Sequence, residues 1–228
     1  MRVLITAGAT RNPVDAIRYL SAHASGKTGV EMVAHLHDLF AREEQRASLF
    51  LLGSAEACLR LKLKALSLPW NLADSEEFFG TRDLLERMRL NVPLADVVIH
   101  SAAVGDYEMA DSTDGKIHSG QSEVNLRLTP TPKILDQIRG WNPTCFLVSF
   151  KAASPGTSPE NLVKIARAQL ERTGSNLVFA NVIGAQDSVW LVSKDESKNF
   201  QRSSAIRAVA DAVFAHKCEV KWPILSAK

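Results

Sequence analysis

Short apolar segments alternate with amphipathic helical patterns along most of this 228-residue chain, and this alternation limits its possible folds more than any other feature. Continuous apolar runs rich in β-branched residues are typical of strands that are buried on both faces of a parallel sheet. The predicted strands are residues 2–6, 47–52, 65–68, 96–100, 145–150 and 177–180, and the predicted helices among them are residues 26–41, 81–90 and 158–172. The pattern therefore predicts an α/β fold with a doubly wound, mainly parallel sheet.

Two stretches depart from this rhythm. Residues 122–128 alternate polar and apolar side chains, which indicates a small antiparallel flap or excursion outside the main sheet. Residues 189–193 and 198–201 suggest a closing antiparallel pair before a last helix at 203–216. Because 46% of the residues are hydrophobic and no segment resembles an interdomain linker, residues 1–228 are expected to form one domain.

Composition argues against several classes of protein. The 27 Lys and Arg residues nearly balance the 25 Asp and Glu residues, and there is no basic run, so nucleic acid is not an expected partner. Cys58, Cys145 and Cys218 are widely spaced, which predicts buried thiols in a reducing compartment. No apolar run approaches the roughly 18 residues that span a bilayer, and the chain begins directly with a strand pattern, so we expect no membrane association and a cytoplasmic location.

The loop after the first strand is unusually long. About 20 residues separate Gly8 from Gly29, where an ordinary connection from strand to helix needs roughly two to six. Such loops bind ligands, because they leave the sheet at the carboxyl ends of its strands. At the end of this loop Ser25, Gly26 and Lys27 stand where a helix begins, so backbone N–H groups, a hydroxyl and an ammonium would converge on an anion such as phosphate. A simple helix cap with a solvated lysine is the alternative interpretation.

Two known nucleotide-binding patterns are only partly present. Residues 21–28 come within one residue of the phosphate-binding pattern GxxxxGK followed by Ser or Thr, with Ser21 in place of the first glycine. That pattern normally follows its strand directly, and here it does not. Gly8 stands alone, without the GxGxxG of dinucleotide-binding proteins, so a nicotinamide-dependent reductase of the Rossmann class rests on fold analogy alone.

Two later loops carry groups that suit nucleotide chemistry. After the predicted strand at 96–100, small residues lead to Asp106, whose carboxylate suits Mg²⁺ or a ribose hydroxyl. Lys116 lies ten residues further on in a glycine-flanked turn, where its ammonium would offset the charge of a triphosphate or the charge that develops during acyl transfer. On spacing alone, an ordinary surface turn is the alternative interpretation of each of these two segments. Phe150 ends the next predicted strand and would pack either on a nucleobase or in the core.

Taken together and in order, these segments resemble the phosphopantothenoylcysteine synthetase family over nearly the whole chain. The opening motif of that family, with its glycine turn, its Asp-x-Val-Arg-Tyr segment and its Ser-Ser-Gly-Lys turn, is similar to residues 6–10, 15–19 and 24–27. Its Ala-Ala-Val-x-Asp-aromatic motif is similar to residues 102–107, and its Lys-Ile pair to Lys116 and the residue after it. Further similarity, mainly to the small single-function members, lies at residues 131–135, 141–143, 148–151 and 180–181.

The resemblance implies a Rossmann-like ligase that joins 4'-phosphopantothenate to cysteine through an acyl nucleotidylate, with ATP or CTP as co-substrate and with Mg²⁺. Catalytic roles are implied for Lys116, Asp106, Lys27 and His23. Contacts with the nucleotide are implied for Gly8, Thr10, Ala103, Asp106, Lys116, Ile134 and Phe150. Contacts with phosphopantothenate are implied for Ala22, Ser25, Gly26, Ala102 and Ala103. Metal ligands are not assigned, and the resemblance also implies a homodimer in which the flap of one subunit helps to complete the site of the other.

The departures from the family pattern leave alternatives open. The family has Asn before the His of this loop, and this chain has Ala22 before His23; a methyl group cannot donate the hydrogen bond of an amide. The second step is then slow, or His23 substitutes, or the protein is a paralogue that binds or activates another phosphorylated carboxylate. Gln169 and Thr173 replace two lysines that are thought to select CTP in the fused bacterial enzymes, which favours ATP slightly.

Overall fold

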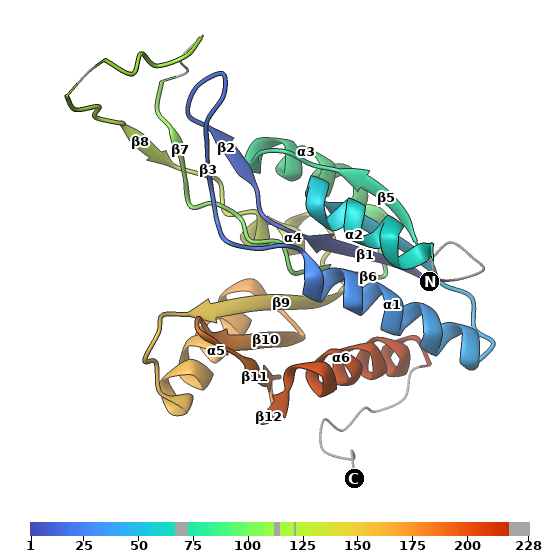
Figure 1. The fold of residues 1–228 in the computed structure, drawn as a ribbon. Helices are drawn as coiled ribbons and strands as arrows, with labels where there is room; N and C mark the ends of the chain where they lie inside the picture. Colours follow the sequence, from blue (N-terminus) through green and yellow to red (C-terminus); the bar gives the residue numbers. More distant parts are fainter. Residues whose placement is uncertain (67–72, 112–114, 121, 219–228) are drawn as a thin grey trace.

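The main sheet is eight-stranded and mostly parallel, as expected (Figure 1). The computed structural model describes residues 1–66, 73–111, 115–120 and 122–218. In spatial order the strands are β12 (Ser197–Gln201), β11 (Ala185–Val192), β10 (Leu177–Val182), β9 (Phe146–Ala153), β6 (Val97–His100), β1 (Arg2–Ala7), β4 (Ser48–Gly53) and β5 (Asp74–Glu77). Strands from β10 to β5 run parallel, whereas β11 and β12 add antiparallel pairs at one edge. The predicted closing pair is therefore confirmed.

Helices cover both faces of this sheet, so the fold is doubly wound. One face is covered by α1 (Lys27–Arg42), α2 (Ala55–Ala65) and α6 (Arg202–Lys217), and the other by α3 (Thr81–Asn91), the short 3₁₀ helix η1 (Val92–Leu94), α4 (Ile134–Trp141) and α5 (Pro159–Thr173). The predicted helices correspond to α1, α3, α5 and α6. Within the described residues, no helix combines the length and the apolar character that crossing a membrane would require.

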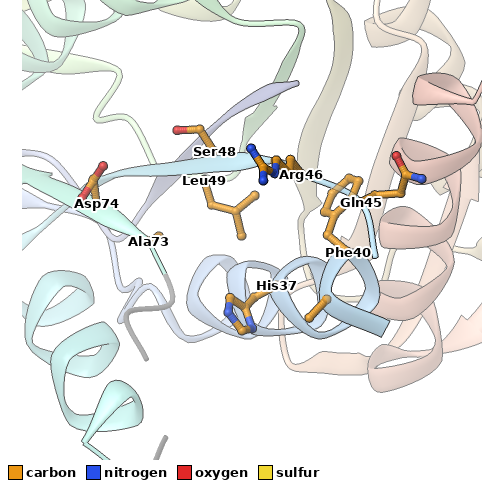
Figure 2. A pocket seen from close by; sticks show the side chains of 10 residues that line it. His37, Phe40, Gln45, Arg46, Ser48, Leu49, Ala73 and Asp74 are labelled. Atoms are coloured by element: carbon orange, nitrogen blue, oxygen red, sulfur yellow. The ribbon is translucent and has the colours of Figure 1, made fainter. Parts of the chain in front are cut away.

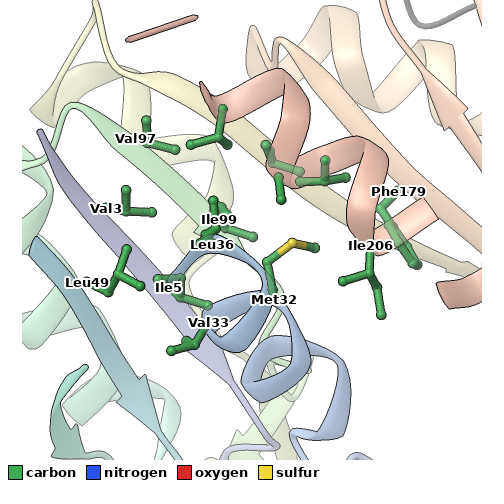
Figure 3. Packing of buried hydrophobic residues seen from close by; sticks show 14 of the residues in the cluster. Val3, Ile5, Met32, Val33, Leu36, Leu49, Val97, Ile99, Phe179 and Ile206 are labelled. Carbon is green, nitrogen blue, oxygen red and sulfur yellow. The ribbon is translucent and has the colours of Figure 1, made fainter. Parts of the chain in front are cut away.

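The central strands are apolar throughout because successive side chains enter different cores. In β1, Val3 and Ile5 pack with Met32 of α1 and Ile206 of α6 (Figure 3), whereas Leu4 belongs to the cluster on the opposite face. All five side chains are buried. Burial of both faces removes the polar and apolar alternation of a surface strand, which explains the continuous apolar runs in the sequence.

Two short hairpins project from the carboxyl end of the sheet. The long first loop forms β2 (Arg11–Pro13) and β3 (Tyr19–Ser21), and the predicted excursion forms β7 (Tyr107–Met109) and β8 (Leu128–Pro130). The hairpins lie side by side in Figure 1, and the Asn12 amide donates to the carbonyl of Tyr107 at 2.8 Å. The antiparallel excursion is thus present.

Three sequence expectations differ from the structure. Residues 122–127 form no strand, and only Leu128 of the predicted alternating segment belongs to β8. Every side chain of that segment is exposed, so no buried face selects its alternation. The strand predicted at residues 65–68 is wrong where it is described, because Ala65 ends α2 and residue 66 is a turn; residues 67–68 lie outside the described residues. Cys58 and Cys145 are buried as expected, but Cys218 is exposed.

Candidate functional site

The loops that follow β1 and β6 are joined by their backbones at the carboxyl end of the sheet. Ala9 and Ala103 form a parallel bridge. The N–H of Ala103 donates to the carbonyl of Gly8 at 2.8 Å, and the N–H of Thr10 donates to the carbonyl of Ala103 at 3.1 Å. The hydroxyl of Thr10 accepts a further bond from Gly105 N–H at 2.8 Å. Two predicted motifs, more than 90 residues apart in sequence, therefore form one backbone surface.

The turn that begins α1 packs against the same surface. Gly8 has φ +91° and Gly26 has φ +73°, a left-handed conformation that favours glycine. A Cβ on Gly26 would lie 2.5 Å from the Cβ of Ala57 and 3.1 Å from the nitrogen of Gly8. Two glycine turns thus approach each other more closely than side chains allow. Gly26 is the N-cap residue of α1. Because glycine has no side chain to accept a hydrogen bond, the first N–H groups of the helix are not capped by this residue.

A pocket of about 440 Å³ lies beside these turns. It is lined by Ala9, Arg11, Tyr19, Ser21, Ala22, His23, Ala24, Ser25 and Glu56. Three of the residues expected to contact substrate or to act in catalysis, namely Ala22, His23 and Ser25, are therefore brought together. Uncapped helix N–H groups beside such a pocket favour a bound anion.

Arg11 is a residue of this pocket that the sequence did not single out. Its guanidinium forms an ion pair with Glu56 and lies 5.0 Å from the centre of the Tyr19 ring. These contacts orient a cationic group on the pocket wall. Arg11 pairs with Ser21, directly before residues 22–25, which are called the substrate loop here because contacts with substrate are expected from them. Since strand pairing alone creates this neighbour, no local sequence signal indicated Arg11.

Lys27 lies at the start of α1 with an exposed side chain. Its ammonium is 3.8 Å from a carboxylate oxygen of Glu31 in the next turn. At this distance and exposure the pair is weak, so the lysine is available to another anion.

Asp106 lies where the loop after β6 approaches the start of α4. Its carboxylate is 2.5 Å from the Lys133 ammonium, and both side chains are exposed. The hydroxyl of Thr131 donates to the carbonyl of Gly105 at 2.6 Å, and the N–H of Thr131 donates to the carbonyl of Asp106 at 3.0 Å. Lys133 adds a positive charge that the sequence analysis did not assign to the site.

The two remaining apolar candidates contribute differently. The side chain of Ile134 is only 1% exposed and packs in the core with Ile138, so a contact with a nucleotide would come from its backbone. Phe150 is half-buried and stacks on Phe179, with ring centres 4.5 Å apart. This position is compatible with both interpretations of Phe150, as a residue that packs on a nucleobase and as a core residue.

Lys116 has an exposed side chain on the excursion between β7 and β8. Its neighbours are hydrogen-bonded to the β2–β3 turn, since Gly115 accepts from Ala16 N–H at 3.0 Å and Ile117 donates to Asp15 at 3.0 Å. Lys116 is therefore attached to the hairpin that carries the substrate loop. The pKa of Asp15 is lowered mainly by the hydrogen bond from Ile17 N–H, and further by the N–H groups of Ile117 and Arg18 and by the Arg18 charge, against the opposing effect of burial.

The donor set suits Mg²⁺ only in combination with a substrate. Among the described residues, no group of three or more His, Cys, Asp or Glu side chains is placed to hold a metal ion. Mg²⁺ is commonly held by one or two carboxylates together with substrate phosphates. Asp106 is exposed at the carboxyl end of the sheet and would fit that arrangement once its carboxylate is released from the ion pair with Lys133.

A second pocket, of about 480 Å³, lies at the opposite end of the sheet (Figure 2). It is formed by His37 and Phe40 of α1 and by the first residues of β4 and β5, such as Ser48 and Asp74. None of the predicted site residues lines it. The carboxyl end of the sheet therefore remains the candidate site, as expected for an open α/β sheet.

A family model, several curated proteins and several solved structures are similar to this chain. The model of the DNA/pantothenate metabolism flavoprotein C-terminal domain family matches residues 1–44 and 66–223. Among curated relatives, the coenzyme A biosynthesis bifunctional protein CoaBC of Thermococcus kodakarensis is 39% identical over 207 residues, which are 88% of this chain and 47% of the relative. The corresponding CoaBC protein of Haemophilus influenzae is 26% identical over 223 residues, covering 93% of this chain and 50% of the relative. The chain thus spans about half the length of these relatives.

Solved structures show the same fold. The DNA/pantothenate metabolism flavoprotein from Streptococcus pneumoniae has a TM-score of 0.78 and 25% identity, with 95% of this chain and 99% of that chain covered. A Cab2 variant in complex with phosphopantothenate-cysteine has a TM-score of 0.72 and 18% identity, with 95% of this chain and 88% of that chain covered.

Proposed function

Because this chain belongs to the DNA/pantothenate metabolism flavoprotein C-terminal domain family, we propose that it is the ligase of coenzyme A biosynthesis that joins 4'-phosphopantothenate to cysteine. The observation that carries the proposal is the meeting of the Gly8, Gly26 and Ala103 turns beside the pocket lined by Ala22 and His23. The names of the CoaBC relatives and of the phosphopantothenate-cysteine complex support the same pathway and substrate class.

The proposed reaction has two balanced steps. The carboxylate of phosphopantothenate attacks the α-phosphorus of a nucleoside triphosphate; the new P–O bond gives an acyl nucleotidylate, and the bond to the β-phosphate breaks to release pyrophosphate. The cysteine amine then attacks the acyl carbon, the nucleoside monophosphate leaves, and the nitrogen loses a proton. Both steps bring anions together or develop negative charge, so fixed cations and N–H donors are the groups that accelerate them.

In this proposal 4'-phosphopantothenate occupies the pocket at residues 22–25. The first N–H groups of α1 and the Lys27 ammonium bind its phosphate, and Arg11 adds charge from the pocket wall. Ala102 and Ala103 are assigned to the wall beside the reacting carboxylate, since their small side chains allow close approach; their N–H groups are already bonded to Thr6 and Gly8. Lys116 neutralises the charge that grows on the phosphoryl and acyl oxygens, which is a transition-state role.

The nucleotide is assigned to the surface formed by Gly8, Thr10 and the loop that contains Asp106. Asp106 is the residue that would hold Mg²⁺, which supplies a Lewis acid for the phosphate oxygens when bound. The nucleotide in this proposal is ATP or CTP, with ATP slightly favoured, since Gln169 is buried and donates to Ser149 at 3.0 Å, so that position carries no ammonium.

In this proposal His23 accepts the proton that the cysteine amine loses in the second step. It lines the same pocket as Ala22, where the family asparagine is missing. The paralogue hypothesis rests on this one position: without the amide donor, the protein would form an acyl nucleotidylate of another phosphorylated carboxylate, or would only bind it.

We also propose a homodimer assembled through the hairpins. Large hydrophobic side chains are exposed there, namely Ile17, Tyr19, Phe79, Tyr107, Val124, Leu126 and Leu128. A second copy that covers this surface would place one flap near the site of the other subunit. Light scattering should give twice the monomer mass for the wild-type protein and for Leu63→Lys, whose exposed leucine lies on α2, but the monomer mass for Tyr107→Lys.

The decisive experiment is pyrophosphate release with ATP and with CTP, each with and without phosphopantothenate and cysteine. The ligase should release pyrophosphate only with phosphopantothenate, and mass spectrometry should detect phosphopantothenoylcysteine only when cysteine is present. If neither nucleotide supports release, the ligase proposal fails. Release without any cysteine adduct would favour the paralogue.

A further inference from the structure

Asp15 is a buried carboxylate in the turn between β2 and β3, where the three residues that follow it, 16–18, are exposed. Its side chain is fully buried, whereas Ile17, two residues later, is 63% exposed. Burial of a carboxylate is costly unless hydrogen bonds and charges compensate it. The groups that contact Asp15 must therefore supply this compensation.

The two carboxylate oxygens of Asp15 have different partners. Oδ1 accepts from Ile17 N–H at 3.0 Å and from Arg18 N–H at 2.8 Å, which closes the turn locally. Oδ2 accepts from Ile117 N–H at 3.0 Å, 102 residues away, and lies 3.2 Å from the Arg18 guanidinium. One oxygen thus shapes the turn and the other binds a distant segment.

That segment carries Lys116, and it is held on both sides of the lysine. Ala16 N–H donates to the carbonyl of Gly115 at 3.0 Å, and the Arg18 guanidinium donates to the carbonyl of Ile117 at 3.4 Å. Attachment of both neighbours fixes the backbone direction at Lys116 and leaves its side chain exposed. The same turn leads through β3 into residues 22–25 of the substrate pocket.

We propose that Asp15 is a positioning residue for the ligase reaction, because its carboxylate attaches the Lys116 segment to the hairpin that carries the substrate loop. This rests on the proposed function in one respect, the role of Lys116. The Asp15 carboxylate is the acceptor in each of its hydrogen bonds, so an amide in its place would set its own N–H₂ against an N–H or a guanidinium. A carboxylate, and not an isosteric amide, is therefore required.

The test is a double-mutant cycle between Asp15→Asn and Lys116→Ala. A small displacement of a catalytic group lowers turnover by up to about 100-fold, so Asp15→Asn should lower kcat on this order while the KM for phosphopantothenate changes little. In the Lys116→Ala background, Asp15→Asn should have no further effect, because its action passes through the lysine. Equal losses in both backgrounds, or no loss with Lys116 present, would overturn the proposal.

Asp111→Asn is the matched control. Asp111 lies on the same excursion, but its carboxylate pairs with Arg127 at 2.8 Å in an exposed ion pair, away from residues 115–117. This variant should retain wild-type kcat. Gly115→Ala provides a second route to the same outcome: Gly115 has φ +111° and nothing within 4 Å of an added Cβ, so alanine strains the backbone beside Lys116 without a clash.

Hydrogen exchange of the wild-type protein separates this proposal from the ligase assignment. The Ile117 amide should exchange more slowly than the amide of Lys116, and Asp15→Asn should remove that difference. Loss of protection with full ligase activity would overturn the positioning role alone. Absence of ligase activity in the wild-type protein, with protection intact, would refute the proposed function instead.

Discussion

The hydroxyl of Thr6 lies 2.9 Å from Nδ1 of His100, and the two residues are neighbours in the register of β1 and β6. Both are buried at the carboxyl end of the sheet, directly before the loops that form the site. The same hydroxyl accepts from Ala102 N–H at 3.1 Å. A neutral imidazole therefore supports the backbone on which the candidate site is built.

Stability should fall as the pH decreases from about 6.5 toward 4. Burial lowers the pKa of His100 to about 4 from its ordinary value of 6.5. Because the folded-state pKa is the lower one, the unfolded chain binds more protons in this window, so stability present above pH 6.5 is lost on acidification. The loss attributable to His100 is roughly 3 kcal/mol at pH 4. Urea unfolding at several pH values measures it.

The variant His100→Gln should have a shallower decline of stability in the same window. His118→Gln, which changes an exposed histidine, is the control and should decline as the wild-type protein does. Parallel declines for wild type and His100→Gln would show that His100 does not carry the acid sensitivity.

Lys116→Ala should lower kcat with little change in folding stability. Removing a pre-arranged charge from a developing oxyanion typically costs about 10²–10³-fold in kcat. The rate of pyrophosphate release in single-turnover experiments measures the first step directly. Lys194→Ala, an exposed lysine outside the carboxyl-end site, should be unaffected; wild-type rates for Lys116→Ala would refute the assignment.

Gly8→Ala should destabilise the protein more than Gly156→Ala. Both glycines have positive φ, so alanine costs each roughly 1–2 kcal/mol of backbone strain. Only at Gly8 would the new Cβ meet other atoms, 2.1 Å from the Ser54 hydroxyl, which adds roughly 1–3 kcal/mol of overpacking. Chemical denaturation compares the two variants, and equal free energies of unfolding would contradict the close packing of the glycine turn.

Ala22→Asn should accelerate the cysteine-dependent second step. The added amide restores a hydrogen-bond donor in the pocket beside His23. The measurement is a chase in which enzyme, nucleotide and phosphopantothenate are first mixed and cysteine is then added. Ala41→Asn places the same group on an exposed position of α1 at the opposite end of the sheet and should leave the chase rate unchanged. No acceleration by Ala22→Asn would indicate that His23 alone supports this step.

The main sheet was predictable because its central strands are buried on both faces. Strand β5, at one edge of the sheet, and helix α2 gave no such signal. All four residues of β5 are exposed and three are acidic, which is typical of an edge strand that avoids pairing with other chains. In α2, Leu59 and Leu63 are exposed while Leu61 is buried. Because leucines alternate with basic residues here, the sequence pattern did not indicate a helix.

The location of the candidate site was predictable from continuous motifs, but the contacts of its charged residues were not. The glycine turns and the substrate loop are such motifs, and their convergence follows from the parallel order of β1 and β6. Arg11, Asp15 and Lys133 acquire their contacts through hairpin pairing or through loops distant in sequence. Local patterns contain no information on which of several charged residues will be brought to such a contact.

The joined turns at Gly8, Gly26 and Ala103 also bear on how such a protein can diverge. Each turn is in contact with another through main-chain atoms, so a substitution that alters one backbone disturbs its neighbours as well. Residues 22–24 line the pocket, and their side chains take no part in these contacts between the turns. New substrate preferences would therefore arise at this short stretch, while the frame proposed to bind phosphate stays unchanged.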